Sequence, residues 1–326
     1  MKVVITGGGG FLGSKLAQAL LARGKLHSPD GSERPISKLV LFDTSFPKKL
    51  PDDARLEYVA GDVADAATVA RVLTPDTASV FHLAAVVSGA AEADFDLGMR
   101  VNLGGTRQVL EQLRHCAAPP RVVFSSSVAA FGGELPAVLD DSTTPNPQTS
   151  YGTQKVAGEY LVTDYSRKGF LDGRSLRLPT IVVRAGAPNA AASSFASSIL
   201  REPLNGKPSP CPVGPETGVW LLSPRRVTEC FVHAHELPSS AWGVNRVVNL
   251  PGITVTVAQM VEALARVAGP KVAERVTWAA DERIRAIVRT WPVQFRTPRA
   301  LALGFRPDED IDSVVRAYIA DEGIRL

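Results

Sequence analysis

Four consecutive glycines, Gly7–Gly10, stand directly after the first predicted strand, Lys2–Thr6. Glycine costs backbone entropy and contributes no side-chain packing, so a run of four indicates that something needs the bare backbone. The run fits two dinucleotide-binding spacings, which are Gly8, Gly10 and Gly13 or Gly7, Gly10 and Gly13. In both, the backbone approaches a pyrophosphate closely, and the helix that begins near Phe11 and Leu12 directs its free N–H groups at that anion.

Short apolar runs alternate with longer helical patterns over the first half of the chain. The predicted strands are Lys2–Thr6, Lys38–Asp43, Leu56–Asp62, Ser79–Ala84, Arg121–Ser127 and Ser175–Val183. The longest predicted helices are Ala91–His115 and Tyr151–Lys168. Strands that alternate with helices pair in parallel through right-handed crossovers. The sequence therefore predicts an α/β fold, a Rossmann-type doubly wound parallel sheet with a smaller C-terminal substrate lobe.

The second half of the chain is patterned differently. Residues 186–224 are rich in Pro, Gly, Ser and Ala, and a returning strand is predicted at Arg246–Gly252. Helices are predicted at Thr256–Gly269, with Thr256 as N-cap, and at Asp308–Ile319. We therefore expect an NAD-binding domain over residues 1–183 with a return segment at about 225–252. The substrate-binding lobe would comprise residues 184–224 and 253–326.

Asp43 ends the second predicted strand, where a carboxylate can accept hydrogen bonds from the adenosine ribose hydroxyls and repel a 2′-phosphate. The stretch KLHSPDGSERPIS, between the first helix and this strand, reads as a surface insertion that lengthens the usual spacing. Asp43 therefore favours NAD over NADP, and a turn-forming aspartate is the structural alternative. Lys48 and Lys49 lie further along and provide a weaker argument for a phosphate.

Tyr151 and Lys155 stand four residues apart in YGTQK, which places both side chains on one face of a helix. A nearby ammonium favours the phenolate, so Lys155 is expected to lower the pKa of Tyr151. Ser125–Ser127 end the fifth predicted strand, at the edge where open α/β sheets bind ligands. A serine hydroxyl there can hydrogen-bond a reacting oxygen.

The overall composition argues against several classes of protein. The 326 residues are 45% apolar and 21% charged, with a net charge of +3 and no dense run of Lys or Arg, so we expect no nucleic-acid partner. Three cysteines, at no metal-ligand spacing, indicate neither a disulfide framework nor a zinc site. No apolar run approaches membrane-spanning length, and no signal-peptide pattern is present. A soluble cytoplasmic protein without a membrane or metal is expected.

The motifs TGGGGFLG, GDV, HLAA, VNLGGT, FSSS and YGTQK together resemble those of the extended short-chain dehydrogenase/reductase family. The resemblance covers the N-terminal two-thirds of the chain and implies an NAD-dependent oxidoreductase. It implies that Ser127, with Ser126 as the alternative, is the catalytic serine, that Tyr151 is the base and that Lys155 binds the nicotinamide ribose. The remaining implied cofactor contacts are Gly7, Gly10, Gly13, Asp62, Val63, Leu83, Ala84, Ala85, Asn102, Pro179 and Ile181.

Some parts of the sequence depart from the common pattern of that family. Phe131 replaces a tyrosine that follows the serine in many members, and the GDG-x-x-x-RDF stretch of nucleotide-sugar enzymes is missing. The segments SSSVAAFGGELP and LRLPTIVVRAGAPNAAASSFASSILREPL instead resemble a branch that oxidises the C2 hydroxyl of a four-carbon sugar acid, D-erythronate, with NAD. A homodimer formed through the two long helices is a family-level expectation.

A sugar-acid substrate requires a cation for its carboxylate, and a guanidinium offers a bidentate fork. Arg184 and either Arg225 or Arg226 are the candidates, and Ser88 is a candidate for binding a hydroxyl by analogy. His233 and His235 would share one face of a strand, but no third ligand accompanies them, so we expect no metal.

Two other functions use part of the same pattern. A nucleotide-sugar epimerase of the UDP-sugar type would use the same Ser-Tyr-Lys residues without net NADH release. A non-enzymatic dinucleotide sensor is disfavoured because such proteins tend to lose the Tyr/Lys pair.

Overall fold

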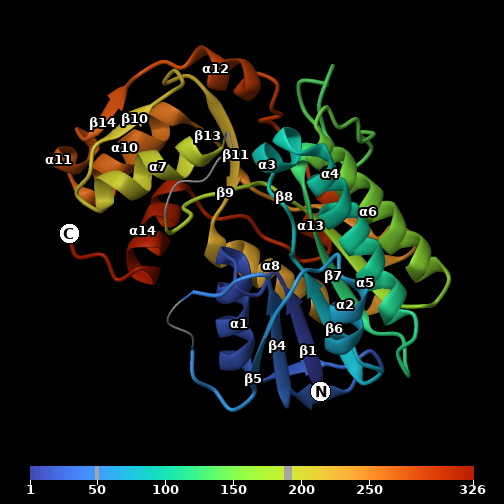
Figure 1. Cartoon of the computed structure of the whole chain (residues 1–326). Helices are drawn as coiled ribbons and strands as arrows, with labels where there is room; N and C mark the ends of the chain where they lie inside the picture. Colours follow the sequence, from blue (N-terminus) through green and yellow to red (C-terminus); the bar gives the residue numbers. More distant parts are fainter. Residues whose placement is uncertain (48–50, 187–192) are drawn as a thin grey trace. The chain divides into compact units, whose positions relative to one another are not determined.

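The computed structural model describes residues 1–47, 51–186 and 193–326, and it divides the chain into two compact units (Figure 1). The first comprises Met1–Ala130, Thr149–Arg177 and Thr228–Val248, and the second comprises Phe131–Gln148, Leu178–Val227 and Asn249–Leu326. Residues 131–148 and 178–183 therefore belong to the second unit, whereas the sequence predicts them in the NAD-binding domain. The return segment of the first unit is also shorter than the predicted 225–252.

A seven-stranded sheet forms the centre of the first unit, in the order β12-β8-β7-β6-β1-β4-β5. The strands are β1 (Lys2–Thr6), β4 (Lys38–Asp43), β5 (Leu56–Ala60), β6 (Thr77–His82), β7 (Arg121–Ser127), β8 (Asp172–Leu178) and β12 (Val247–Asn249). β1 pairs in parallel with both β4 and β6. Strands β4 and β5 follow on one side of β1, and strands β6, β7 and β8 on the other. The doubly wound parallel sheet is therefore confirmed, with the glycine run at its switch point.

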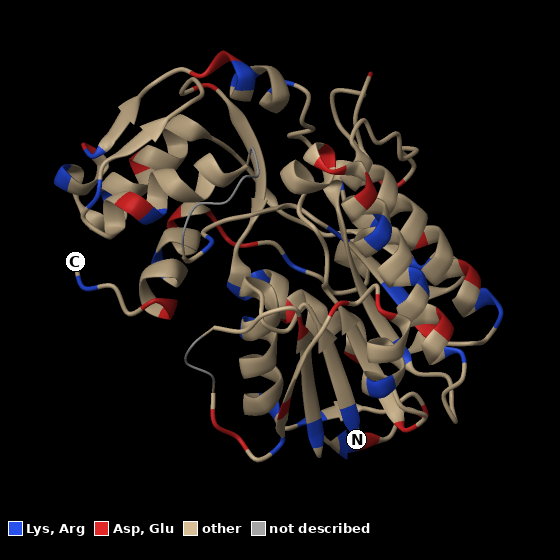
Figure 2. Cartoon of the chain, viewed as in Figure 1, with Lys and Arg blue, Asp and Glu red and all other residues tan. Residues whose placement is uncertain are grey.

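Helices cover the sheet, and a hairpin fills the insertion before β4. The elements are α1 (Phe11–Arg23), β2 (Lys25–His27), β3 (Glu33–Pro35), α2 (Ala66–Val72), α3 (Ser88–Ala93), α4 (Phe95–Gly98), η1 (Met99–Gly105), α5 (Thr106–Leu113), η2 (Val128–Ala130), α6 (Ser150–Arg167), α8 (Pro224–Glu236) and α9 (Ser239–Trp242). Side chains of α2, α5 and α6 pack with those of β1, β4, β6 and β7 in one apolar core. Charges of both signs lie along α5 and α6 (Figure 2).

Two predicted elements are interrupted. The helix predicted over Ala91–His115 breaks at Asp94, whose extended backbone ends α3 and whose carboxylate caps α4 by accepting from Leu97 N at 2.9 Å. It then passes through the π-helical turn η1 before α5. The strand predicted over Ser175–Val183 stops at Leu178 because Pro179, which has no N–H to donate, separates β8 from β9.

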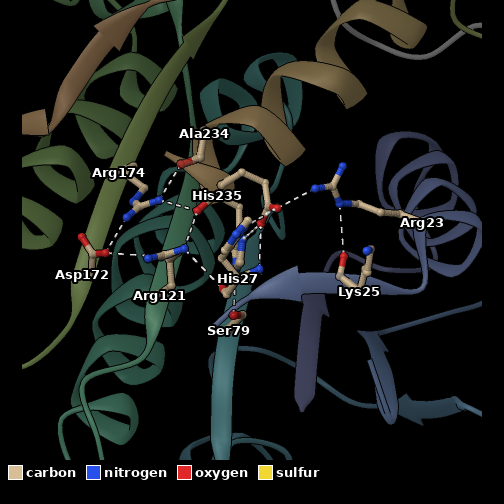
Figure 3. A network of polar contacts seen from close by, with 10 residues as sticks. Arg23, Lys25, His27, Ser79, Arg121, Asp172, Arg174, Ala234 and His235 are labelled. Atoms are coloured by element: carbon tan, nitrogen blue, oxygen red, sulfur yellow. Dashed lines mark hydrogen bonds and ion pairs between the residues drawn. The ribbon is translucent and has the colours of Figure 1, made fainter. Parts of the chain in front are cut away.

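The end of α8 is fixed to the sheet by a buried polar network (Figure 3). Arg174 donates to the carbonyls of Ala234 and His235 at 2.5 and 2.7 Å, and Arg121 donates to that of His235 at 2.8 Å. Two cations thereby satisfy the terminal carbonyls of the helix. The His235 ring contacts Ser79 Oγ at 2.8 Å through Nε2. His233 and His235 therefore belong to a helix, and the one-face strand arrangement predicted for them is wrong.

Buried imidazoles make the stability of this unit depend on pH. Burial lowers the pKa of His235 to about 4 and that of His82 to about 3, from a usual 6.5, so both stay neutral in the folded chain. Unfolding then takes up protons below pH 6.5, and the stability that is present above this pH is lost as the pH falls toward 4. We expect the free energy of unfolding to be about 2–3 kcal/mol lower near pH 5.5 than near pH 7.5.

Urea titrations at the two pH values measure this difference. A His235→Gln variant serves as the comparison, because it removes one of the two groups and should show a shallower dependence on pH. Equal unfolding free energies of the unsubstituted chain at both pH values would contradict the prediction.

The second unit has its own apolar core, formed largely by α7, α10 and α14. Its elements are β9 (Thr180–Ile181), α7 (Ser194–Leu204), β10 (Ser209–Cys211), β11 (Gly218–Leu222), β13 (Ile253–Thr256), α10 (Val257–Ala268), α11 (Pro270–Ala273), β14 (Val276–Trp278), α12 (Glu282–Val288), α13 (Pro298–Ala302) and α14 (Ile311–Asp321). Thr256 caps α10 as predicted, in a capping box with Gln259. Among the described residues, no helix is long and apolar enough to cross a membrane.

Candidate active site

The glycine run forms a turn in which side chains have no room. Gly7 has φ +73°, and a Cβ on it would lie 2.8 Å from the backbone N of Ala84. A Cβ on Gly13 would lie 2.1 Å from the carbonyl oxygen of Gly7. Gly7 is thus the glycine whose left-handed backbone makes the turn, which favours the spacing Gly7, Gly10 and Gly13 over the one that starts at Gly8.

This turn fits a pyrophosphate. The N-cap of α1 is Gly10, and within the described residues no side chain caps this helix end. The N–H groups of the first turn, which contains Phe11 and Leu12, therefore remain available to an anion at the positive end of the helix dipole.

Asp43 lies beside the same turn. Its carboxylate accepts from Gly9 N at 3.0 Å and from Thr44 N at 2.7 Å. The carboxylate thus stands between the glycine turn and the end of β4, where a ribose hydroxyl would be held. Lys48 and Lys49, the weaker candidates for a phosphate, lie outside the described residues.

We expect Gly13→Ala to raise the Kd for NADH by at least ~10-fold, because the added methyl group must displace the Gly7 carbonyl and distort the turn. Gly104→Ala is the matched control, since a Cβ there meets only Met99 O at 3.4 Å, an ordinary contact. Fluorescence titration with NADH measures both. Unchanged affinity in Gly13→Ala would contradict the assignment of this turn to the cofactor.

The other predicted cofactor positions in this unit border the same end of the sheet. Asp62 follows β5 and forms an ion pair with Arg100, while Val63 packs on Gly105, where a Cβ would lie 2.7 Å from Val63 Cγ1. Leu83, which follows β6, donates its N–H to Thr6 O at 3.1 Å. Of the other predicted contacts, Ala84 donates its N–H to Thr6 Oγ1 at 3.3 Å, and Asn102 hydrogen-bonds to the backbone of Val86.

Tyr151, Lys155 and Ser127 are also brought together. Thr149 caps α6 by accepting from Gly152 N at 3.1 Å, which places Tyr151 in the first turn. Tyr151 shares a hydrogen bond with Ser127. Lys155 Nζ lies 5.6 Å from the centroid of the Tyr151 ring and donates to Ser125 O at 2.8 Å. A hydroxyl, a phenol and an amine thus converge at the end of β7.

The pKa values in this cluster differ from the expectation. Burial raises the pKa of Tyr151 to about 12, and the hydrogen bond with Ser127 only partly opposes this shift. Burial lowers the pKa of Lys155 to about 7, against the opposing effect of Glu159. The predicted lowering of the Tyr151 pKa by Lys155 is therefore not found: burial dominates, and the Ser127 side chain is the group that opposes it. A phenolate here needs positive charge from a bound partner.

Ser126, the alternative catalytic serine, is engaged elsewhere. It is buried, and its hydroxyl donates to Glu159 Oε1 at 2.5 Å. Arg177 donates to both oxygens of the same carboxylate, at 2.9 and 2.7 Å. The structure therefore favours Ser127 over Ser126, since the Ser126 hydroxyl completes a buried ion pair that ties α6 to β7 and β8.

The remaining predicted cofactor and substrate positions fall in both units. Ser88 begins α3 in the first unit, whereas Pro179, Ile181, Arg184 and Arg225 belong to the second. Arg184 is partly buried, and burial lowers its pKa. Arg225 is 49% exposed and pairs with Asp321 at 2.5 Å. This surface pair makes Arg225 a weaker candidate for a buried carboxylate.

A buried chain of hydrogen bonds next to Ala84, one of the predicted cofactor contacts, was not anticipated. It includes Thr6, His82 and Thr106, and His82 contacts the other two at 2.6 and 3.0 Å. The sequence contained a signal, because a histidine stands inside the apolar run SVFHLA. Glu159 was also missed, although it continues the four-residue spacing of Tyr151 and Lys155.

The chain is similar to several known proteins. Its residues 3–222 match the model of the NAD dependent epimerase/dehydratase family. A D-erythronate dehydrogenase of Cupriavidus necator is 57% identical over 99% of each chain. A D-erythronate dehydrogenase of Haemophilus influenzae is 46% identical over 98% of this chain and 99% of its own. A crystal structure titled as a nucleoside-diphosphate-sugar epimerase, from Agrobacterium tumefaciens, is 38% identical with a TM-score of 0.92, covering 100% of this chain and 95% of its own.

Proposed function

This chain belongs to the NAD-dependent epimerase/dehydratase family of extended short-chain dehydrogenases/reductases, and on that premise we propose that it oxidises D-erythronate at C2. The product would be 2-dehydro-D-erythronate. The chain is an NAD-dependent oxidoreductase. The observation that carries the substrate proposal is the full-length identity to two D-erythronate dehydrogenases.

The grouping of Tyr151, Ser127 and Lys155 supports a direct hydroxyl oxidation. Ser127 holds the C2 hydroxyl oxygen, and the phenolate of Tyr151 accepts its proton. Lys155 would bind the nicotinamide ribose and, in its ammonium form, would add to the positive charge that the phenolate needs. Bound NAD supplies the acceptor for the hydride that leaves C2. The balanced products are one keto acid, one NADH and one proton.

The glycine turn and its neighbours would hold the cofactor. Gly7, Gly10 and Gly13 would leave space for the pyrophosphate, and the N–H groups of the first turn of α1 would donate to it. Asp43 would accept the ribose hydroxyls, which disfavours a 2′-phosphate and hence NADP.

We propose that Arg184 holds the substrate carboxylate, with Arg225, which forms a surface pair with Asp321, as the alternative. The half-buried Arg184 offers a fork-shaped donor in a less hydrated setting. Ser88 is assigned to a substrate hydroxyl.

A homodimer in the cytoplasm completes the proposal. The faces of α4 and α6 expose Phe95 and Tyr160, whose exposed fractions of 59% and 65% suit burial against a second copy. Light scattering in solution measures the mass. A monomer at micromolar concentration would contradict the dimer.

NADH absorbance tests the proposed reaction. The purified chain is incubated with NAD and, separately, with D-erythronate, its stereoisomers and longer sugar acids, beside UDP-sugar controls. The proposal predicts a high rate with D-erythronate. A nucleotide-sugar epimerase is the second candidate, because the Agrobacterium tumefaciens structure carries that title. Conversion of a UDP-sugar without net NADH, together with no activity on any acid, would favour that candidate.

A further inference from the structure

The segment that follows β6, Leu83–Val87, is held in place by buried side chains at two points. Ala84 N donates to Thr6 Oγ1 at 3.3 Å. Val86 N donates to Asn102 Oδ1 at 2.7 Å, and Val86 O accepts from Asn102 Nδ2 at 3.1 Å. These hydrogen bonds determine where the backbone of the segment lies. Its position matters because the segment is proposed to contact the cofactor and leads into Ser88.

The first of these two points is the hydrogen bond from Ala84 N to Thr6 Oγ1. The hydroxyl and imidazole protons around it can be placed in only one way. The single hydroxyl proton of Thr106 goes to Asn102 O at 2.6 Å, so Thr106 can only accept from His82 Nε2–H. His82 is neutral, and its Nδ1 must therefore accept the Thr6 hydroxyl proton. Thr6 Oγ1 is then left to accept from Ala84 N. The imidazole thus has a fixed tautomer that connects Ala84 to the backbone of η1.

The second point is the pair of hydrogen bonds between Val86 and Asn102, and Asn102 is in turn bonded to α6. Gln154 stands between Tyr151 and Lys155 in sequence, is 1% exposed, and accepts from Asn102 Nδ2 through Oε1 at 2.7 Å. Asn102 Nδ2 thereby uses both of its protons, one on Val86 O and one on Gln154.

Space for this glutamine is provided by Gly98. A Cβ on Gly98 would lie 2.7 Å from Gln154 Nε2. Within the described part of the chain, Nε2 itself has no hydrogen-bond partner. A buried N–H without a partner is unfavourable, and a leucine of similar size would avoid it. The benefit that offsets this cost must come from the Gln154 oxygen, which accepts the hydrogen bond from Asn102.

We propose that Gln154 is a positioning residue, which fixes the segment Leu83–Val87 relative to Tyr151 and Lys155 through Asn102. The effect on turnover rests on the proposed function, whereas the effect on the backbone of the segment does not. Loss of the acceptor leaves Asn102 Nδ2 with one partner, so the asparagine can rotate and Val86 is released more often. A small displacement of reacting groups is sufficient to lower turnover strongly.

Three variants separate this role from a general structural one. Gln154→Leu keeps the volume and removes the acceptor, whereas Gln154→Glu keeps an acceptor oxygen in a side chain of the same length. Thr153→Ala changes an exposed neighbour on the same helix. Hydrogen exchange of the peptide that contains Leu83–Val87 is measured by mass spectrometry, with a β7 peptide as internal reference. The full chain is used, and NADH affinity and thermal midpoint are measured in parallel.

For Gln154→Leu, we expect exchange in the Leu83–Val87 peptide to be at least ~10-fold faster while the β7 peptide is unchanged. We also expect kcat to fall by ~10- to 100-fold. Gln154→Glu, assayed at mildly acidic pH, should restore slow exchange, and Thr153→Ala should match the unsubstituted chain. Unchanged exchange in Gln154→Leu, or equally faster exchange in both peptides, would overturn the proposal. If the unsubstituted chain does not oxidise D-erythronate, the proposed function fails, but the exchange result still decides the role of Gln154.

Discussion

Replacing Tyr151 with phenylalanine is expected to lower kcat for sugar-acid oxidation by ~10³-fold. The substitution removes only the phenolic oxygen, which shares a hydrogen bond with Ser127 and is the proposed acceptor of the substrate proton. Burial raises the pKa of Tyr151 to about 12. The activity of the unsubstituted enzyme should therefore rise with pH, because more of the phenolate forms. That rise should be absent in Tyr151→Phe.

Stopped-flow and steady-state NADH formation measure this effect. Tyr160→Phe provides the control, because Tyr160 lies on the same helix with an exposed fraction of 65%. NADH affinity of Tyr151→Phe should stay within about threefold of the unsubstituted value, since the ring that packs beside Lys155 is retained. Normal turnover in Tyr151→Phe would exclude the proposed mechanism.

The largest effect on stability is expected from Glu159→Ala, which should lower the free energy of unfolding by about 3–5 kcal/mol. Glu159 is buried, accepts from Ser126 and forms a two-point ion pair with Arg177. Its removal takes away the carboxylate that holds the buried Arg177 guanidinium at two points. The ion pair joins α6 to the sheet, so the loss should also loosen the helix that carries Tyr151 and Lys155.

Urea unfolding followed by circular dichroism measures this loss. The double variant Glu159→Leu with Arg177→Met serves as the matched comparison, because it removes both charges together and should recover most of the stability. The single and double variants thus separate the loss of one charge of the pair from the loss of packing. A loss below about 1 kcal/mol in Glu159→Ala would show that Arg177 is not dependent on this carboxylate.

Much of the first unit follows from local sequence patterns. The strands Lys2–Thr6, Lys38–Asp43 and Arg121–Ser127 were predicted with their observed bounds, since each is a short apolar run bounded by polar or glycine residues. The helix carrying Tyr151 and Lys155 begins one residue earlier than predicted. The position of Asp43 at the end of its strand was also correct. These features depend on neighbours in the sequence, which periodicity captures.

Features that depend on distant contacts were not predicted. The break at Asp94 is a local exception: its carboxylate caps a new helix turn by accepting from Leu97 N, but the helical periodicity continues through it and hid this signal. The spacing of His233 and His235 suits either a strand or a helix, and only the docking on Arg121 and Arg174 distinguishes them. The engagement of Ser126 by Glu159 depends on a helix that lies beside its strand. The raised pKa of Tyr151 likewise comes from burial, which the spacing to Lys155 does not reveal.

The most direct test of the central claim is the fate of the hydrogen at C2. D-Erythronate carrying deuterium at C2 is incubated with the chain and NAD, and the NADH that forms is analysed by mass spectrometry. Hydride transfer from C2 predicts NADH heavier by one mass unit and a slower rate if that transfer limits turnover. Unlabelled NADH would contradict oxidation at C2, and the absence of NADH formation would contradict the proposed dehydrogenase reaction as a whole.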